Sequence, residues 1–188
     1  LSASNIAQDD NGTLWVTSGS LFSKSAGVWT KYTPQNTNIP IDSSSIRHVV
    51  MGNQNEVWFQ ANRRALGRFH QTTGFETVDF PFGTGGFTPY IRDLAVRPNG
   101  DVWIVLYSLQ TYFICVWNGE EMLEIDPTNS PMVNNRVERL YRDNNGSLWL
   151  IGSKGMDEIR PNGDWYFYEM QESTLFTNYV RGILSKSD

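Results

Sequence analysis

Cysteine, histidine and long apolar runs are scarce in this sequence. Its 188 residues include one cysteine and two histidines, and no apolar run approaches the ~20 residues that a membrane-spanning helix requires. Cys115 cannot form an intrachain disulfide, and its place in the apolar run YFICVW predicts a buried strand residue. These scarcities exclude a disulfide scaffold and argue against direct insertion into a membrane.

Sequence patterns typical of catalysis are also missing. No HExxH, CxxC, GxSxG or Walker pattern occurs, so zinc, acyl-transfer and phosphate-loop chemistry lack their minimal residues. We therefore expect a protein that is not an enzyme, with no catalytic residue, no metal and no cofactor. His48 and His70 are interpreted as structural strand residues. The acidic turns at Asp9-Asp10 and Asp143 are interpreted as turn stabilisers, because they fall short of the oxygens that calcium needs.

Positive charge is too sparse for a nucleic-acid partner. The net charge is −5, and the densest basic spot is Arg63-Arg64. A polybasic membrane anchor is absent as well. The chain begins at Leu1 rather than at Met and shows no signal peptide, which indicates either a processed leader or a piece of a longer protein.

What the sequence does contain is an internal repeat. The segments DNGTLWV, GNQNEVWF, RPNGDVWI and NNGSLWL place a tryptophan at positions 15, 58, 103 and 149, with spacings of 43, 45 and 46 residues. Apolar residues recur twelve, nine and one position before each tryptophan. Each unit reads as four short strands, and such a period is typical of the blades of a β-propeller.

The repeat predicts an all-β chain that is a single propeller segment of four-stranded antiparallel blades. The expected blades cover residues 2–44, 45–89, 90–135 and 136–178, and residues 179–188 would begin a further blade. Asn-Gly pairs at 99–100 and 145–146 predict tight hairpins with positive φ at both central residues. Four tryptophans are expected to be buried on second strands between adjacent blades: Trp15, Trp58, Trp103 and Trp149.

Four blades and one extra strand favour part of a larger propeller over a closed four-bladed one. The remainder, NYVRGILSKSD, aligns with a first strand and then stops. An open fragment would expose apolar blade flanks that a larger propeller buries. We therefore expect the isolated chain to form a homo-oligomer, most simply a dimer.

The repeat units also carry a family resemblance. The pattern apolar-x-x-apolar followed by D-x-x-G-x-L-W, best seen in VERLYRDNNGSLWLIGSKGMDEI and DDNGTLWVTSGSLFS, resembles the two-component regulator propeller repeat. The second unit departs from it at Asn53 and Asn55, and the third has Arg97-Pro98 and the insertion LYSLQTY. Members of that family are periplasmic sensor regions of hybrid two-component and histidine kinase regulators, often serving polysaccharide use. The resemblance therefore implies a periplasmic or extracellular sensor domain.

Binding residues are expected in the loops that join second to third and fourth to first strands, because these loops gather at one face of a propeller. They carry aromatic, amide and guanidinium groups that suit an oligosaccharide or a peptide. First strands would add an arginine ring of Arg47, Arg92 and Arg181, although pairing between blades is the better explanation for it. The predicted ligand-binding residues are Arg63, Arg64, Phe87, Tyr90, Arg92, Tyr107, Tyr112, Arg136 and Tyr179.

Three functions are compatible with these features. The favoured one is a non-catalytic ligand-sensing propeller of a bacterial signal-transduction protein, with a carbohydrate as the expected ligand. The second is a structural or protein-interaction propeller that uses the same loops. The third is a polysaccharide lyase or glycosidase, whose two carboxylates would come from distant loops.

Overall fold

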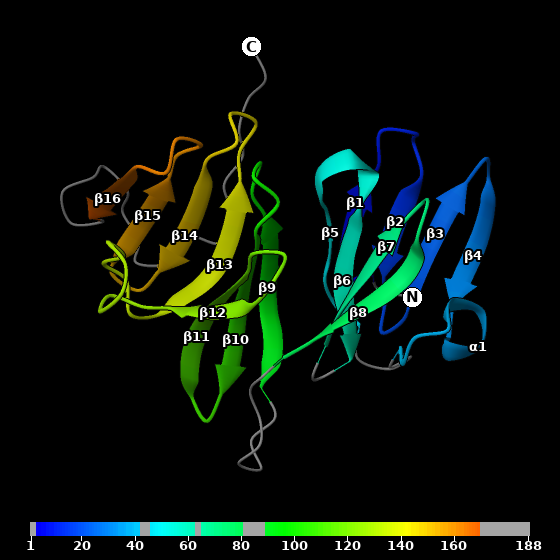
Figure 1. Cartoon of the computed structure of the whole chain (residues 1–188), viewed down its shortest axis with the longest axis horizontal. Helices are drawn as coiled ribbons and strands as arrows, with labels where there is room; N and C mark the ends of the chain where they lie inside the picture. The colour runs from blue at the N-terminus through cyan, green and yellow to red at the C-terminus, as the bar shows by residue number, and fades with distance from the viewer. Residues whose placement is uncertain (1–2, 42–45, 63–64, 81–88, 170–188) are drawn as a thin grey trace. The chain divides into compact units, whose positions relative to one another are not determined.

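The computed structural model describes residues 3–41, 46–62, 65–80 and 89–169. Within these ranges sixteen strands form four antiparallel sheets, each made of four strands that follow one another in the sequence (Figure 1). The chain is therefore all-β and built of propeller blades, which confirms the predicted fold class. It divides into two compact units, residues 1–91 with blades 1 and 2 and residues 92–188 with blades 3 and 4.

The strands of each blade pair in sequence order. Blade 1 consists of β1 (Asn5–Gln8), β2 (Leu14–Thr17), β3 (Leu21–Ser25) and β4 (Val28–Tyr32), and blade 2 of β5 (Val49–Met51), β6 (Val57–Asn62), β7 (Ala65–His70) and β8 (Gly74–Asp79). Blade 3 consists of β9 (Tyr90–Val96), β10 (Val102–Ser108), β11 (Thr111–Trp117) and β12 (Met122–Ile125), and blade 4 of β13 (Val137–Arg142), β14 (Leu148–Gly152), β15 (Gly155–Ile159) and β16 (Trp165–Glu169).

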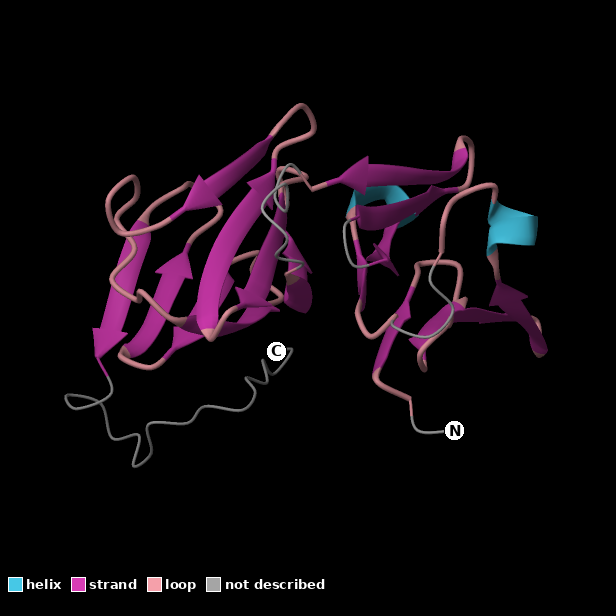
Figure 2. Cartoon of the chain, turned by 90° about the horizontal axis from the view of Figure 1, so that it is seen from below, coloured by secondary structure: helices cyan, strands magenta, loops and turns pink. Residues whose placement is uncertain are grey.

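Helical structure is confined to short connections in the described ranges. They are α1 (Pro34–Thr37) and the 3₁₀ turn η1 (Asn53–Asn55), both cyan in Figure 2. None of the described helices has the length and apolar character needed to cross a membrane.

The Asn-Gly hairpins differ from the prediction in one respect. Only the glycines adopt positive φ, as at Gly100 (96°) and Gly146 (85°). The N–H of Gly100 donates to the carbonyl of Arg97, and the side chain of Asn99 accepts from the amide of Asp101. Each turn is thus a type I turn closed by a glycine bulge, which Asn99 stabilises in blade 3 and Asp143 stabilises in blade 4.

One aspartate holds both the turn and the tryptophan in two of the blades. Oδ1 of Asp9 accepts from the backbone N–H groups two and four residues further on, and its Oδ2 accepts from Nε1 of Trp15 at 3.2 Å. Asp143 makes the same three hydrogen bonds in blade 4, with 3.0 Å to Nε1 of Trp149. The acidic turns therefore have the stabilising role that the sequence predicts.

Blades 2 and 3 lack this aspartate, so the indole Nε1 of their tryptophan does not have the same hydrogen-bond acceptor. In blade 2, Nε1 of Trp58 donates to Glu56 at 3.3 Å. In blade 3 the position is occupied by Arg97, whose guanidinium donates to the carbonyl of Arg160 at 2.8 Å. The buried Nε1 of Trp103 then has no hydrogen-bond partner among the described residues.

Burial of the repeated tryptophans follows the prediction for three of the four. Trp15, Trp58 and Trp103 are 3%, 2% and 4% exposed, and all lie on the second strand of their blade. Trp149 lies at the equivalent position but is only half-buried, against Tyr168 at 5.4 Å between ring centroids. The prediction of full burial is therefore wrong for this one residue.

Each unit contains its own core. In the first unit Trp15 stacks on Tyr32 of its own blade and contacts Phe69 of blade 2, with 5.5 and 5.1 Å between ring centroids. In the second, Trp103 packs with Val105 and Ile114 of blade 3 and with Leu140 and Leu148 of blade 4.

The innermost strands within each unit are joined by the same side-chain bond. Oδ1 of Asn5 in β1 accepts from the amide of Val49 in β5 at 3.4 Å, and Oδ2 of Asp93 in β9 accepts from the amide of Leu140 in β13 at 3.0 Å. Asn5 and Asp93 both lie ten residues before the tryptophan of their blade. Burial raises the pKa of the Asp93 carboxyl because it disfavours the charged form. Asn5 makes the corresponding bond with a neutral side chain, which has no charge to bury.

Candidate functional site

The second unit contains a pocket of about 250 Å³ between blade 3 and the segment that leads into blade 4. Its lining residues come from the start of β11, the end of β12, the connection 126–136 and the start of β13. In blade 3 the hairpin between the second and third strands and the connection after the fourth strand lie at the same end of the sheet. The pocket thus lies among two of the loops expected to bind ligand.

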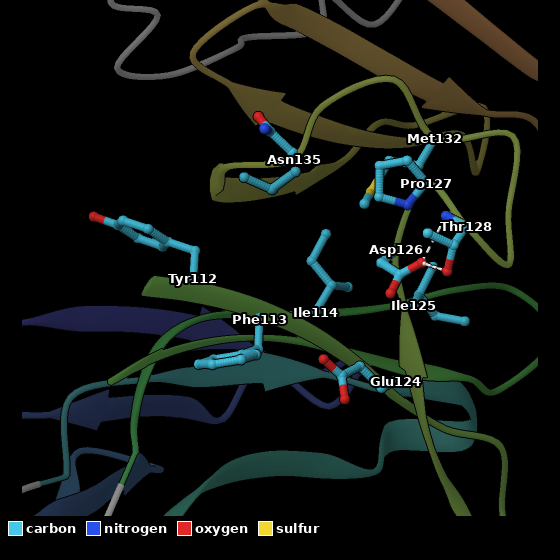
Figure 3. A pocket seen from close by; sticks show the side chains of 11 residues that line it. Tyr112, Phe113, Ile114, Glu124, Ile125, Asp126, Pro127, Thr128, Met132 and Asn135 are labelled. Carbon is cyan, nitrogen blue, oxygen red and sulfur yellow. Dashed lines mark hydrogen bonds between the residues drawn. The ribbon is translucent and has the colours of Figure 1, made fainter. Parts of the chain in front are cut away.

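Strand register decides which side chains face the pocket. Tyr112, Ile114 and Ile125 share the face of blade 3 that carries Trp103. Figure 3 shows Ile114 directed toward the connection, whereas Phe113 and Glu124, which also line the pocket, lie on the other side of the strands. The opposite wall is formed by Pro127, Met132 and Val137. The pocket is therefore mainly apolar.

Two polar groups lie at the edge of this apolar wall. Oδ1 of Asp126 accepts hydrogen bonds from the amide and the hydroxyl of Thr128 at 2.6 and 2.5 Å, and these bonds lower the pKa of the Asp126 carboxyl (Figure 3). Its Oδ2 accepts no hydrogen bond from the described part of the chain. The exposed side chain of Asn135 likewise makes no hydrogen bond with a described residue. A carboxylate oxygen and an amide are therefore open to a ligand.

The first half of the connection is fixed by bonds to its own backbone. Asn129 donates to the carbonyl of Glu124 at 2.8 Å and accepts from the amide of Asp126 at 2.9 Å, while Ser130 donates to the carbonyl of Asp126 at 2.6 Å. These bonds hold residues 126–130 in one conformation before any ligand is present, which lowers the entropic cost of binding.

The second half is fixed by a buried pair, Asn134 and Asp157. The Asp157 carboxylate accepts from the amide of Val133 at 2.9 Å and from the amide and side chain of Asn134 at 3.2 and 2.7 Å. Oδ1 of Asn134 in turn accepts from the amide of Lys154 at 3.0 Å. Because Asn134 is fully buried, it orients the backbone on both sides of it, including Met132 and Asn135.

Three of the predicted ligand-binding residues lie together beside this pocket. The rings of Tyr107 and Tyr112 meet edge to face with 4.7 Å between centroids. The guanidinium of Arg136 lies 5.1 Å from the centroid of the Tyr112 ring and forms a 2.9 Å ion pair with Glu138. Tyr112 and Glu138 together raise the pKa of Arg136. The three side chains thus form one contiguous cluster, which we call the Tyr-Arg cluster.

The remaining predicted residues are not part of this cluster. Tyr90 is exposed at the start of β9, and Arg92 lies two residues later on the innermost strand, where its Nε is buried without a partner among the described residues. Arg139 donates to the carbonyl of Arg92 at 3.3 Å. Arg63, Arg64, Phe87 and Tyr179 lie outside the described residues.

The sequence interpretation missed Asp126, Asn135 and the buried Asn134. A signal for the connection was nevertheless present, because blade 1 repeats it: Thr33-Pro-Gln-Asn36 corresponds to Asp126-Pro-Thr-Asn129. Asn36 donates to the carbonyl of Lys31 at 2.8 Å, as Asn129 does to the carbonyl of Glu124. The pattern x-Pro-x-Asn therefore marks a structured connection rather than a plain loop.

The pocket lining includes two carboxylates, Glu124 and Asp126, and neither of the two histidines of the chain. Across the described ranges, no three histidine, cysteine or carboxylate side chains are grouped as a metal site requires.

Comparisons with known proteins support the fold. No protein-family model and no curated protein matches the chain. Among solved structures it is similar to virginiamycin B lyase from Staphylococcus aureus, with 18% identity and a TM-score of 0.63 over 89% of this chain and 55% of the lyase. It is also similar to the extracellular domain of a hybrid two-component system from B. thetaiotaomicron, with 17% identity and a TM-score of 0.59 over 87% of this chain and 21% of that domain.

A third similar structure is that of YCF48 bound to a D1 peptide, with 15% identity and a TM-score of 0.55 over 89% of this chain and 52% of the other. At these identities the likenesses show a β-propeller fold and nothing more specific. The chain spans little more than half the length of the lyase and about a fifth of the extracellular domain.

Proposed function

We propose that this chain is a non-catalytic, ligand-binding segment of a β-propeller sensor, and that its ligand is a carbohydrate bound at the pocket and the Tyr-Arg cluster. The observation that carries the proposal is the pocket itself. It joins an apolar wall, an open carboxylate oxygen and an open amide, on a connection that internal hydrogen bonds hold in place. Apolar walls with a few fixed polar groups are typical of small-molecule sites.

A sensing role in the periplasm or outside the cell follows from the resemblance of the repeat. The similarity to an extracellular domain of a two-component system agrees with that role. As part of the same proposal, the isolated chain forms a homo-oligomer through blade flanks that a larger propeller would bury.

The test is calorimetric titration of the chain with neutral, amino and uronic oligosaccharides, followed by the same titration of variants. Tyr112→Ala and Arg136→Ala are expected to weaken binding on the order of tenfold. The control is Tyr166→Ala, because Tyr166 also has an arginine over its ring, with Arg160 at 3.8 Å from the centroid, and does not line the pocket. Equal loss in all three variants, or no binding to any sugar, overturns the proposal.

The lyase alternative has its own readout in the same samples. Virginiamycin B lyase is one of the similar structures, so the chain is incubated with virginiamycin B and with uronic polysaccharides. Intact substrate by mass spectrometry is the expected result. Cleaved virginiamycin B or an unsaturated sugar would show that the chain is an enzyme and would contradict the proposed non-catalytic function.

A further inference from the structure

The pocket contains three chemically different elements. Its floor is apolar, made by Ile114, Met132 and Val137. Its edge offers Oδ2 of Asp126 as an acceptor, and Asn135 as an amide that can donate. A ligand group that uses all three combines an apolar part with a hydrogen-bond donor and an acceptor, and an acetamido group does so with its methyl, N–H and carbonyl.

We propose, resting on the carbohydrate function above, that the pocket selects the acetamido group of an N-acetylated amino sugar. The acetamido N–H donates to Oδ2 of Asp126, and the acetamido carbonyl accepts from the side chain of Asn135. The methyl group enters the apolar floor and is removed from water. The two polar contacts use groups that the described part of the chain leaves open.

Charge around the pocket supports a neutral group over an anionic one. The lowered pKa of Asp126 keeps its carboxylate charged across the neutral range, and a carboxylate repels uronates. The nearby cation, Arg136, is already paired with Glu138 at 2.9 Å. A sugar carboxylate would therefore meet a negative edge and a cation that is already paired.

Size supports a substituent or a single ring over an extended chain. The volume of about 250 Å³ lies just below the range of drug-sized sites, ~300–1,000 Å³. The apolar floor is buried, with Met132 only 5% exposed, so the deepest part of the pocket accepts an apolar group rather than a hydroxyl. One N-acetylated residue of an oligosaccharide fills this space, and neighbouring residues extend past the Tyr-Arg cluster.

The test uses three β-1,4-linked glucose trimers that differ only at carbon 2: the N-acetylglucosamine, glucosamine and glucose trimers. We expect the N-acetylated trimer to bind at least tenfold more tightly than the other two by calorimetry. Tightest binding of the glucosamine trimer means that Asp126 selects an ammonium group and overturns the acetamido assignment. Equal binding of all three also overturns it, and the proposed carbohydrate function then stands. Binding of none of the trimers, with binding of another sugar, has the same meaning.

Two variants locate the effect within the protein. Asp126→Asn keeps the acceptor for Thr128 but places an N–H₂ where the acetamido N–H must donate, so a loss of about tenfold is expected for the N-acetylated trimer alone. Glu120→Gln is the matched control, because this exposed carboxylate lies in the turn between β11 and β12 and does not line the pocket. Equal loss in both variants overturns the assignment to this pocket. N-acetylalanine methylamide serves as a peptide probe. If it binds more tightly than the N-acetylated trimer, the ligand is a peptide and the sugar assignment is overturned.

Discussion

The hydrogen bond between Asp9 and Trp15 is expected to be a measurable part of the stability of the first unit. Asp9→Asn tests it alone, since asparagine keeps Oδ1 for the two backbone N–H groups of the turn. The Nδ2 group of the asparagine, however, replaces the oxygen Oδ2 of Asp9, which accepts from Nε1 of Trp15 at 3.2 Å. Two donors then face each other at a site where the indole is 3% exposed.

The magnitude follows from what is left unpaired. A buried donor without a partner costs about 1–3 kcal/mol, so Asp9→Asn should lower the free energy of unfolding by that amount. Asp9→Ala also removes the acceptor of two turn amides that lie near solvent, at about 1 kcal/mol each. The alanine variant should therefore lose about 3–5 kcal/mol in total.

Urea denaturation followed by circular dichroism measures both variants. The matched control is Asp10→Asn, which changes an exposed carboxylate next to Asp9 that makes no side-chain hydrogen bond with a described residue. Its free energy of unfolding should change by less than about 0.5 kcal/mol. If Asp9→Asn and Asp10→Asn were equally mild, the indole bond would not contribute and the reasoning would be refuted.

Three further predictions concern the second unit. Burial raises the pKa of Asp93, so the stability that its carboxyl contributes is present at low pH and lost as pH rises through that pKa. Asp93→Asn keeps one of the two acceptors for the amides of Leu94 and Leu140 and does not titrate, so its free energy of unfolding should rise relative to that of the parent as urea titrations move from pH 4 to pH 8; a constant difference would contradict this. Burial, and secondarily a nearby carboxylate, raises the pKa of the Cys115 thiol to about 12. Ellman's reagent at pH 8 should therefore label the chain about a thousandfold faster when it is unfolded in urea than when it is folded, and rapid labelling without urea would contradict burial. Arg97→Asp should give Nε1 of Trp103 an acceptor and raise the urea midpoint, even though the hydrogen bond from Arg97 to the carbonyl of Arg160 is lost. Arg97→Ala loses the same bond without supplying an acceptor, so it should not raise the midpoint.

The fold was predictable because the repeat records a packing requirement. A tryptophan on the second strand of each blade, with apolar residues at fixed distances before it, indicates an apolar surface that must be covered once per blade. Trp15, Trp58 and Trp103 are buried as expected. The same periodicity predicts equal burial for Trp149, which is only half-buried against Tyr168. Turn geometry was predicted only in part, since asparagine can stabilise a turn in more than one backbone conformation.

The site was less predictable because its residues have roles that depend on pairing across the sheet. Tyr112 and Arg136 come from expected loops, but their stacking depends on where β11 begins relative to the connection. Asn134 and Asn135 are adjacent and identical in type, yet one is buried against Asp157 and the other is exposed. No property of the amino acid separates them, because the distinction arises from the position of β15.

The repeated connection explains how similar blades can present different surfaces. Thr33-Pro-Gln-Asn36 and Asp126-Pro-Thr-Asn129 share the asparagine that closes the turn, and Ile39 and Met132, six residues after the first position of each, are both buried. What differs is the first residue, which is a carboxylate with an open oxygen only in blade 3. The scaffold of the connection is thus set by the repeat, while its chemistry toward a ligand is set by a position that the repeat leaves free to vary.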